Sequence, residues 1–72
     1  MLDVSPSELV VCAYICAGYS IKEIASKLFR SAYTISTHLT SVRKRNNLKG
    51  VAEIAREFVL IYGDPYEFLK KI

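Results

Sequence analysis

The sequence predicts an all-α fold, in which four helices are followed by a short fifth helix at the C-terminus. Three segments begin alike, with Ser or Asp followed three residues later by Glu, which is the pattern of a capped helix start; they are Ser5–Glu8, Ser20–Glu23 and Asp64–Glu67. No segment shows the alternation of apolar and polar residues that is typical of a half-buried strand. Because 51% of the 72 residues are hydrophobic, the chain is expected to form one domain with its own core.

Caps and helix breakers give the expected bounds of each helix. Proline is favoured at the first helical position, and glycine just past the last one. The first helix therefore begins at Pro6, after its cap Ser5, and ends at Gly18, and the second runs from Ser20 to a break at 29–31. The third helix runs from about Ala32 to Asn46, and the fourth from near Gly50 or Val51 to Gly63. We thus expect a four-helix domain over residues 1–63 and a helical extension over residues 64–72.

The basic residues are concentrated in the middle of the chain. Between Lys22 and Lys49 there are seven Lys or Arg residues and one Glu, a net charge of +6, whereas the whole chain carries only +3. The same segment holds the second and third predicted helices, joined by a short turn. Two helices joined in this way form the unit that places its second helix in a groove of DNA.

The third predicted helix has two different faces. At 100° per residue, one stripe of it is mainly apolar and is expected to be buried, and it comprises Ile35, His38, Leu39, Val42 and Asn46. The opposite face has no acidic residue and carries Tyr33, Ser36, Thr37, Thr40, Lys44 and Asn47. Short hydroxyl side chains let a helix approach base edges, and Arg43, Lys44 and Arg45 suit phosphates. Taken alone, this face is equally compatible with a solvated surface, but the preceding short helix favours DNA.

Other classes of function find little support in the sequence. Cys12 and Cys16 lie four residues apart in an apolar run, where two small core residues are more plausible than a disulfide or a metal site. His38, on the apolar stripe, is expected to be packed and not catalytic, and no metal or cofactor is expected. The longest apolar run, residues 9–17, is too short to span a membrane. We therefore expect a cytoplasmic protein that is not an enzyme.

The ordered motifs resemble those of the LuxR-type, or GerE/NarL-like, helix-turn-helix domain of bacterial transcription regulators. Residues 5–9, Ser-Pro-Ser-Glu-Leu, are similar to the family's opening Thr-Pro-x-Glu-x. Residues 17–25 are similar to its turn and scaffold helix, Gly-x-Ser-Asn-Lys-Glu-Ile-Ala. Residues 28–38 are similar to its recognition segment, Leu-x-x-Ser-x-x-Thr-Val-x-x-His. The resemblance implies a sequence-specific DNA-binding domain that binds double-stranded DNA, in which a recognition helix over about 32–46 lies in the major groove.

The resemblance also implies roles for particular residues. It assigns base contacts to Ser36, Thr37 and Thr40, to which the exposed face of the third helix adds Tyr33. It assigns phosphate contacts to Ser20, Lys22, Thr34 and Lys44, beside Arg43 and Arg45 from the helical face. Family members dimerise on DNA through the fourth helix, and in many of them a sensory domain precedes this one. Departures from the family pattern include Arg30, Val51, and Asn46 in place of Leu or Met.

The first and fourth helices have more apolar surface than an ordinary member of this family. The stripes expected to face the core are Leu9, Cys12, Ala13 and Cys16 in the first helix, and Val51, Ala55, Phe58 and Tyr62 in the fourth. Other apolar residues lie outside these stripes, and they should be covered. The C-terminal extension could cover them, or Val59, Leu60 and Tyr66 could form a dimer or partner surface. The alternative function is therefore a protein-interaction module that keeps the helix-turn-helix but has lost specific DNA reading.

Overall fold

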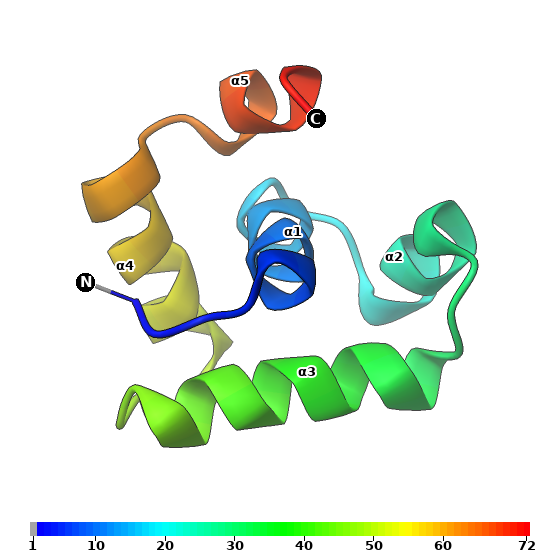
Figure 1. Ribbon diagram of the computed structural model, residues 1–72, viewed down its shortest axis with the longest axis horizontal. Coiled ribbons are helices and arrows are strands. Elements are labelled where there is room, and N and C mark those ends of the chain that lie inside the picture. Colours follow the sequence, from blue (N-terminus) through cyan, green and yellow to red (C-terminus); the bar gives the residue numbers. More distant parts are fainter. Residues whose placement is uncertain (1) are drawn as a thin grey trace.

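A computed structural model of the chain describes residues 2–72, and in that range it contains five helices and no strand. The helices are α1 (Pro6–Cys16), α2 (Ile21–Leu28), α3 (Ala32–Arg45), α4 (Val51–Tyr62) and α5 (Pro65–Lys70). The first helix lies at the centre, seen nearly end-on in Figure 1, and packs against each of the other four. The predicted all-α fold of four helices and a short fifth is confirmed.

The helix starts follow the predicted caps, with one difference. Ser5 and Ser20 each accept a hydrogen bond from the backbone N–H of the Glu three residues later, and that Glu accepts one from the N–H of the Ser. At α5 the Asp64–Glu67 pattern predicts the same pair of bonds, and this prediction is wrong for Glu67. Asp64 accepts a bond from Tyr66 N, at 2.8 Å, while the Glu67 carboxylate lies 3.6 Å from Lys70 Nζ, an ion pair within the same short helix.

The first three helices end in the same way. A residue in the left-handed conformation is followed by a backbone hydrogen bond that reaches back five residues. The left-handed residues are Gly18 (φ 97°), Phe29 (φ 55°) and Asn47 (φ 56°). In each case the next residue donates its N–H to a carbonyl five positions back, at 2.8–3.0 Å. Glycine and asparagine tolerate this conformation, but a bulky residue such as Phe29 pays roughly 1–2 kcal/mol for it. The turn between α2 and α3 is thus well defined but strained.

The core is made mainly of small and branched residues that pack around α1. It consists of Val11, Cys12, Ala13, Ile24, Ala25, Ile35, Leu39, Val42, Ile54 and Phe58. The predicted core stripe of α4 was wrong in one respect, because Ile54 is fully buried while Val51, at the start of the helix, is 47% exposed. In α1 the predicted stripe likewise lacks Val11, which is buried, whereas it includes Leu9 and Cys16, which are only half-buried. In α1 and in α4, the buried face is therefore rotated slightly about the helix axis relative to the predicted stripe.

Helix α5 covers one end of α1 and the last turns of α4 (Figure 1). The ring of Phe68 packs edge-on against Phe58, with centroids 5.3 Å apart, and also contacts Tyr62. The Tyr66 hydroxyl donates a hydrogen bond of 2.6 Å to the carbonyl of Ala17, at the end of α1. The extension therefore covers part of α1 and α4, as one of its two predicted roles requires, but Val59, Leu60 and Ile61 on α4 remain exposed.

We predict that ending the chain at Gly63 destabilises the domain. The loss of the half-buried Phe68 and Leu69 should remove roughly 2–4 kcal/mol of folding free energy, and the melting temperature should fall by about 10 °C or more. Thermal unfolding followed by circular dichroism measures this. Replacing the exposed Ile72 by Ala is the matched control and should leave the melting temperature unchanged. An unchanged melting temperature in the truncated chain would show that α5 contributes nothing to stability.

Candidate nucleic-acid interface

Helices α2 and α3 form the helix-turn-helix, and local signals set its geometry. Ser20 caps α2, and Ser31 caps α3 by accepting a hydrogen bond of 3.1 Å from Thr34 N. The Ser31 and Thr34 hydroxyls also lie 2.9 Å apart. Two residues, Arg30 and Ser31, separate the left-handed Phe29 from the first turn of α3. The start of α3 is therefore held by its own side chains.

The two faces of α3 differ in burial as the sequence predicted. Ile35, Leu39 and Val42 are at most 5% exposed, because they pack on α1, α2 and α4. The opposite face is exposed along its length and carries Tyr33, Ser36, Thr37, Thr40 and Lys44. In Figure 1 this helix runs along one edge of the molecule, with the other helices on one side of it. A long polar face is thus left open to a partner.

The hydroxyl groups on this face are not equivalent. Thr37 Oγ1 donates a hydrogen bond of 2.9 Å to the carbonyl of Tyr33, one turn back in the helix. Thr37 therefore presents a methyl group and an acceptor to a ligand, because its proton is already used. No such bond engages the hydroxyls of Ser36 and Thr40 within residues 2–72, so each of these can donate or accept.

A basic cleft lies beside this face and was not predicted as a unit. Its volume is about 250 Å³, and its polar lining comes from Ser36, Thr40, Arg43 and Lys49, with Ile21, Leu39, Val51 and Ile54 as apolar walls. It lies where the starts of α2 and α4 approach α3. Lys49 belongs to the basic segment of the sequence, but its proximity to Thr40 could not be predicted, because it depends on how the chain turns after Asn47.

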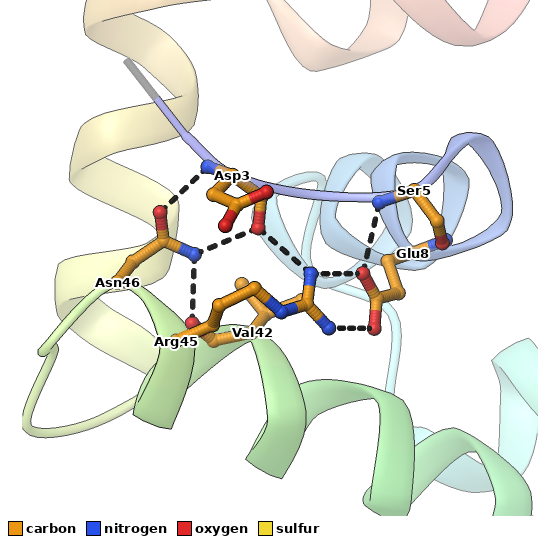
Figure 2. Close-up of polar contacts among 6 residues, drawn as sticks. All are labelled: Asp3, Ser5, Glu8, Val42, Arg45 and Asn46. Atoms are coloured by element: carbon orange, nitrogen blue, oxygen red, sulfur yellow. Dashed lines mark hydrogen bonds and ion pairs between the residues drawn. The ribbon is translucent and has the colours of Figure 1, made fainter.

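The side chain of Arg45 lies outside this cleft, against α1, in a position that the sequence did not predict. Its guanidinium forms a two-point ion pair with the Glu8 carboxylate, with both N–O distances 2.8 Å (Figure 2). Glu8 is only 6% exposed, and it also accepts a hydrogen bond of 2.9 Å from Ser5 N. Because Arg45 is committed to Glu8, a phosphate would have to compete with a buried carboxylate for it. The predicted phosphate contact at Arg45 is therefore not retained.

The Arg45 guanidinium and the Ser5 cap also determine how Glu8 titrates. The hydrogen bond from Arg45 is the largest effect, and it lowers the pKa of Glu8 from 4.5 to about 2, against the opposing effect of burial. Burial has the opposite effect on the cysteines, and together with the nearby charge of Glu8 it raises the pKa of the Cys12 thiol to about 11. Cys12 and Cys16 are both free thiols, and a thiol with so high a pKa is a poor nucleophile.

Comparison with known proteins agrees with this geometry. The sequence profile of the bacterial regulatory proteins of the luxR family (GerE) matches residues 3–58, which include α1, α2, α3 and most of α4. The chain belongs to the luxR family of bacterial regulatory proteins. It is thus a helix-turn-helix DNA-binding domain of the transcription-regulator type, and this is not a family of enzymes. No solved structure matches the chain significantly.

One curated relative shows how this luxR-family domain relates to longer proteins. The oxygen regulatory protein NreC of Staphylococcus carnosus (strain TM300) is 42% identical over 50 residues, which are 69% of this chain and 23% of NreC. The chain therefore matches less than a quarter of that relative. Within residues 2–72, no helix has the length and apolar character needed to cross a membrane, and no group of three or more His, Cys, Asp or Glu side chains is placed to hold a metal ion.

The predicted dimer or partner surface lies outside the part that matches the luxR family. Val59 and Leu60 are 48% and 68% exposed on the outer side of α4. Tyr66 is 59% exposed, although its hydroxyl is bonded to Ala17. The three side chains are thus accessible to a partner.

We predict that Glu8 makes the stability of the domain depend on pH. Since its pKa is lower in the folded chain, its contribution is fully present above about pH 4.5 and is lost as the pH falls towards 2. The loss should amount to roughly 2–4 kcal/mol. Urea unfolding at several pH values measures it.

The matched variants are Glu8→Gln and Glu67→Gln. Glu8→Gln should be less stable at pH 7 and should flatten the dependence below pH 4.5, because Arg45 then lacks a charged partner. Glu67→Gln, at an exposed pair, should leave the profile almost unchanged. The same profile for Glu8→Gln and the original chain would contradict this assignment.

Proposed function

We propose that this luxR-family domain places α3 in the major groove of double-stranded DNA and so regulates transcription in the bacterial cytoplasm. The observation that carries the proposal is the exposed face of α3, which is polar, has no acidic residue, and adjoins the basic cleft. From residue 24 to residue 52 the chain contains no Asp or Glu. A DNA backbone that follows this face would meet no repelling carboxylate on the helix itself.

Base reading is assigned to the hydroxyl side chains of this face. Ser36 and Thr40 can donate or accept a hydrogen bond at a base edge, whereas Thr37 suits a donor on a base or the thymine methyl group. Tyr33 is 81% exposed at the first turn of α3 and completes the set of predicted base contacts. These contacts would give the domain its sequence preference.

Phosphate contacts are assigned to groups that flank this face. They are Ser20 and Lys22 at the start of α2, Thr34 in the first turn of α3, and Arg43 and Lys44 in its last turn. The cleft adds Lys49, while Arg45 is omitted because of its bond to Glu8. Phosphate contacts fix the position of the helix on DNA and supply most of the salt-dependent affinity.

The proposal includes a homodimer on DNA and an additional domain in the parent protein. Val59 and Leu60 expose apolar side chains on α4, the helix through which the resemblance implies dimerisation, and Tyr66 is exposed on α5. The relative NreC is more than four times as long as the matched segment, which supports a sensory domain elsewhere in a longer chain. A closed dimer would present two α3 helices to two half-sites.

The alternative is a protein-interaction module that keeps the architecture without reading DNA. It is favoured by the exposure of large apolar side chains, above all Phe29 at 91% and Leu60 at 68%. DNA binding is the stronger proposal, because the basic cleft and the polar face of α3 lie together, and an apolar partner would make use of neither.

The DNA-binding proposal predicts a steep dependence on salt. If about six phosphates are contacted, affinity for a mixed-sequence duplex should fall by roughly 10³-fold between 50 and 200 mM salt, because bound counterions are released. Fluorescence anisotropy with a labelled duplex pool measures it. No binding at 50 mM salt would refute DNA binding and favour the interaction module.

Two substitutions on α3 should separate positioning from reading. Lys44→Ala should weaken binding to all sequences about equally and reduce the salt slope by about one. Thr40→Ala should instead change the preferred base at one position, by about 1–3 kcal/mol. Selection from a randomised duplex library, with each variant and the original chain, distinguishes them. A changed motif for Lys44→Ala with an unchanged one for Thr40→Ala would mean that α3 docks differently.

A further inference from the structure

The segment before α1 is fastened to the C-terminal end of α3. The side-chain amide of Asn46 pairs with the backbone of Asp3 at two points, as Figure 2 shows. Asp3 N donates a hydrogen bond of 2.6 Å to Asn46 Oδ1, and Asn46 Nδ2 donates one of 3.1 Å to the Asp3 carbonyl. The same Nδ2 donates a bond of 2.8 Å to the Val42 carbonyl, within α3.

A second residue of α3 reaches the same point. Arg45 Nη1 donates a hydrogen bond of 2.9 Å to the Asp3 carbonyl, in addition to its pair with Glu8. Leu2, just before Asp3, is only 6% exposed, so the segment is also held by apolar packing. Two bonds in opposite directions to one residue fix both the distance and the direction of the segment, as a neighbouring strand would.

This connection lies where the proposed DNA surface has its basic end. Arg43 and Lys44 are in the last turn of α3, and Lys49 follows within the turn to α4. The helix ends at Arg45 with Asn46 as its C-terminal cap, and Asn47 reverses the chain in the left-handed conformation. Any shift of this end relative to α1 would therefore move three of the assigned phosphate contacts together.

We propose that residues 2–5 act as a latch that positions the C-terminal end of α3 for DNA, with Asn46 as the positioning residue. An event that draws this segment away from Asn46 lowers the affinity for DNA without touching the DNA-facing side chains. The latch thus provides a point of control on the segment that leads into α1. Its effect on DNA rests on the proposed function, while its effect on the end of α3 does not.

The first test compares DNA affinity at a temperature at which every variant is folded by circular dichroism. Asn46→Leu keeps a side chain of similar size but loses all three amide bonds, and Asn46→Ala checks that no clash is responsible. Both should bind a mixed-sequence duplex about three- to tenfold more weakly at low salt, which corresponds to the loss of about one net hydrogen bond. Phe68→Leu is the control for general stability, because it loses the ring contact between α5 and Phe58, away from α3, and should bind DNA like the original chain.

The second test does not involve DNA. Amide hydrogen exchange should be faster in both Asn46 variants at residues 46–48, whose N–H groups bond to the carbonyls of Val42, Lys44 and Arg43. Phe68→Leu, on a helix that does not contact α3, should leave these amides unchanged. If their exchange is the same in the Asn46 variants as in the original chain, the latch is refuted, whether or not the domain binds DNA.

The outcomes separate the latch from the proposed function. If the original chain does not bind the duplex at low salt, DNA binding fails, and hydrogen exchange alone decides whether the latch exists. If the original chain binds and the Asn46 variants bind equally well, the positioning role is overturned. If Phe68→Leu loses as much affinity as they do, the loss reflects general stability, and the latch is again overturned.

Discussion

The nearly buried carboxylate of Glu8 is the constraint on which the arrangement of α1 and α3 depends. It caps α1 through Ser5 and, with both oxygens, binds Arg45 at the far end of α3. A charge with so little solvent is costly unless it is paired and hydrogen-bonded, so the two helices must meet at this point. Removing either partner leaves the other without its counter-charge, and this costs more folding free energy than replacing both residues with apolar ones. The ion pair therefore specifies how the two helices cross as well as contributing stability.

The rest of the fold is arranged around a central helix made of small residues. Cys12 and Ala13 are fully buried in α1, and their short side chains let α2, α3 and α4 approach closely. A domain of 72 residues has little core to spare, and α5 adds to it by bringing Phe68 against Phe58. The family match ends before α5 begins, so this chain gains part of its core from a segment that the match does not include.

Local features of the fold were predictable from sequence, and long-range partners were not. Capping patterns gave the helix starts to within a residue, since each involves groups at most three positions apart. The sidedness of α3 followed from its periodicity, because its apolar stripe is narrow. In α4 the apolar residues cover most of the surface, so periodicity could not choose Ile54 over Val51. The pairing of Arg45 with Glu8, 37 positions away, depends on how the helices cross, which the pattern of either helix alone does not contain.

The difference between local features and long-range partners also explains which part of the candidate interface could be predicted. The basic segment has a charge of +6 by sequence, but Glu8, outside that segment, neutralises Arg45, so the charge available to a phosphate is closer to +5. Within residues 2–72 the ion pairs are Glu8–Arg45 and Glu67–Lys70, and neither engages Lys22, Arg43, Lys44 or Lys49. A phosphate at those four would displace no carboxylate partner, whereas at Arg45 it would leave the buried carboxylate of Glu8 unpaired. Burial of the counter-charge, and not the number of basic residues, therefore decides which cations remain available to a ligand and which hold the fold.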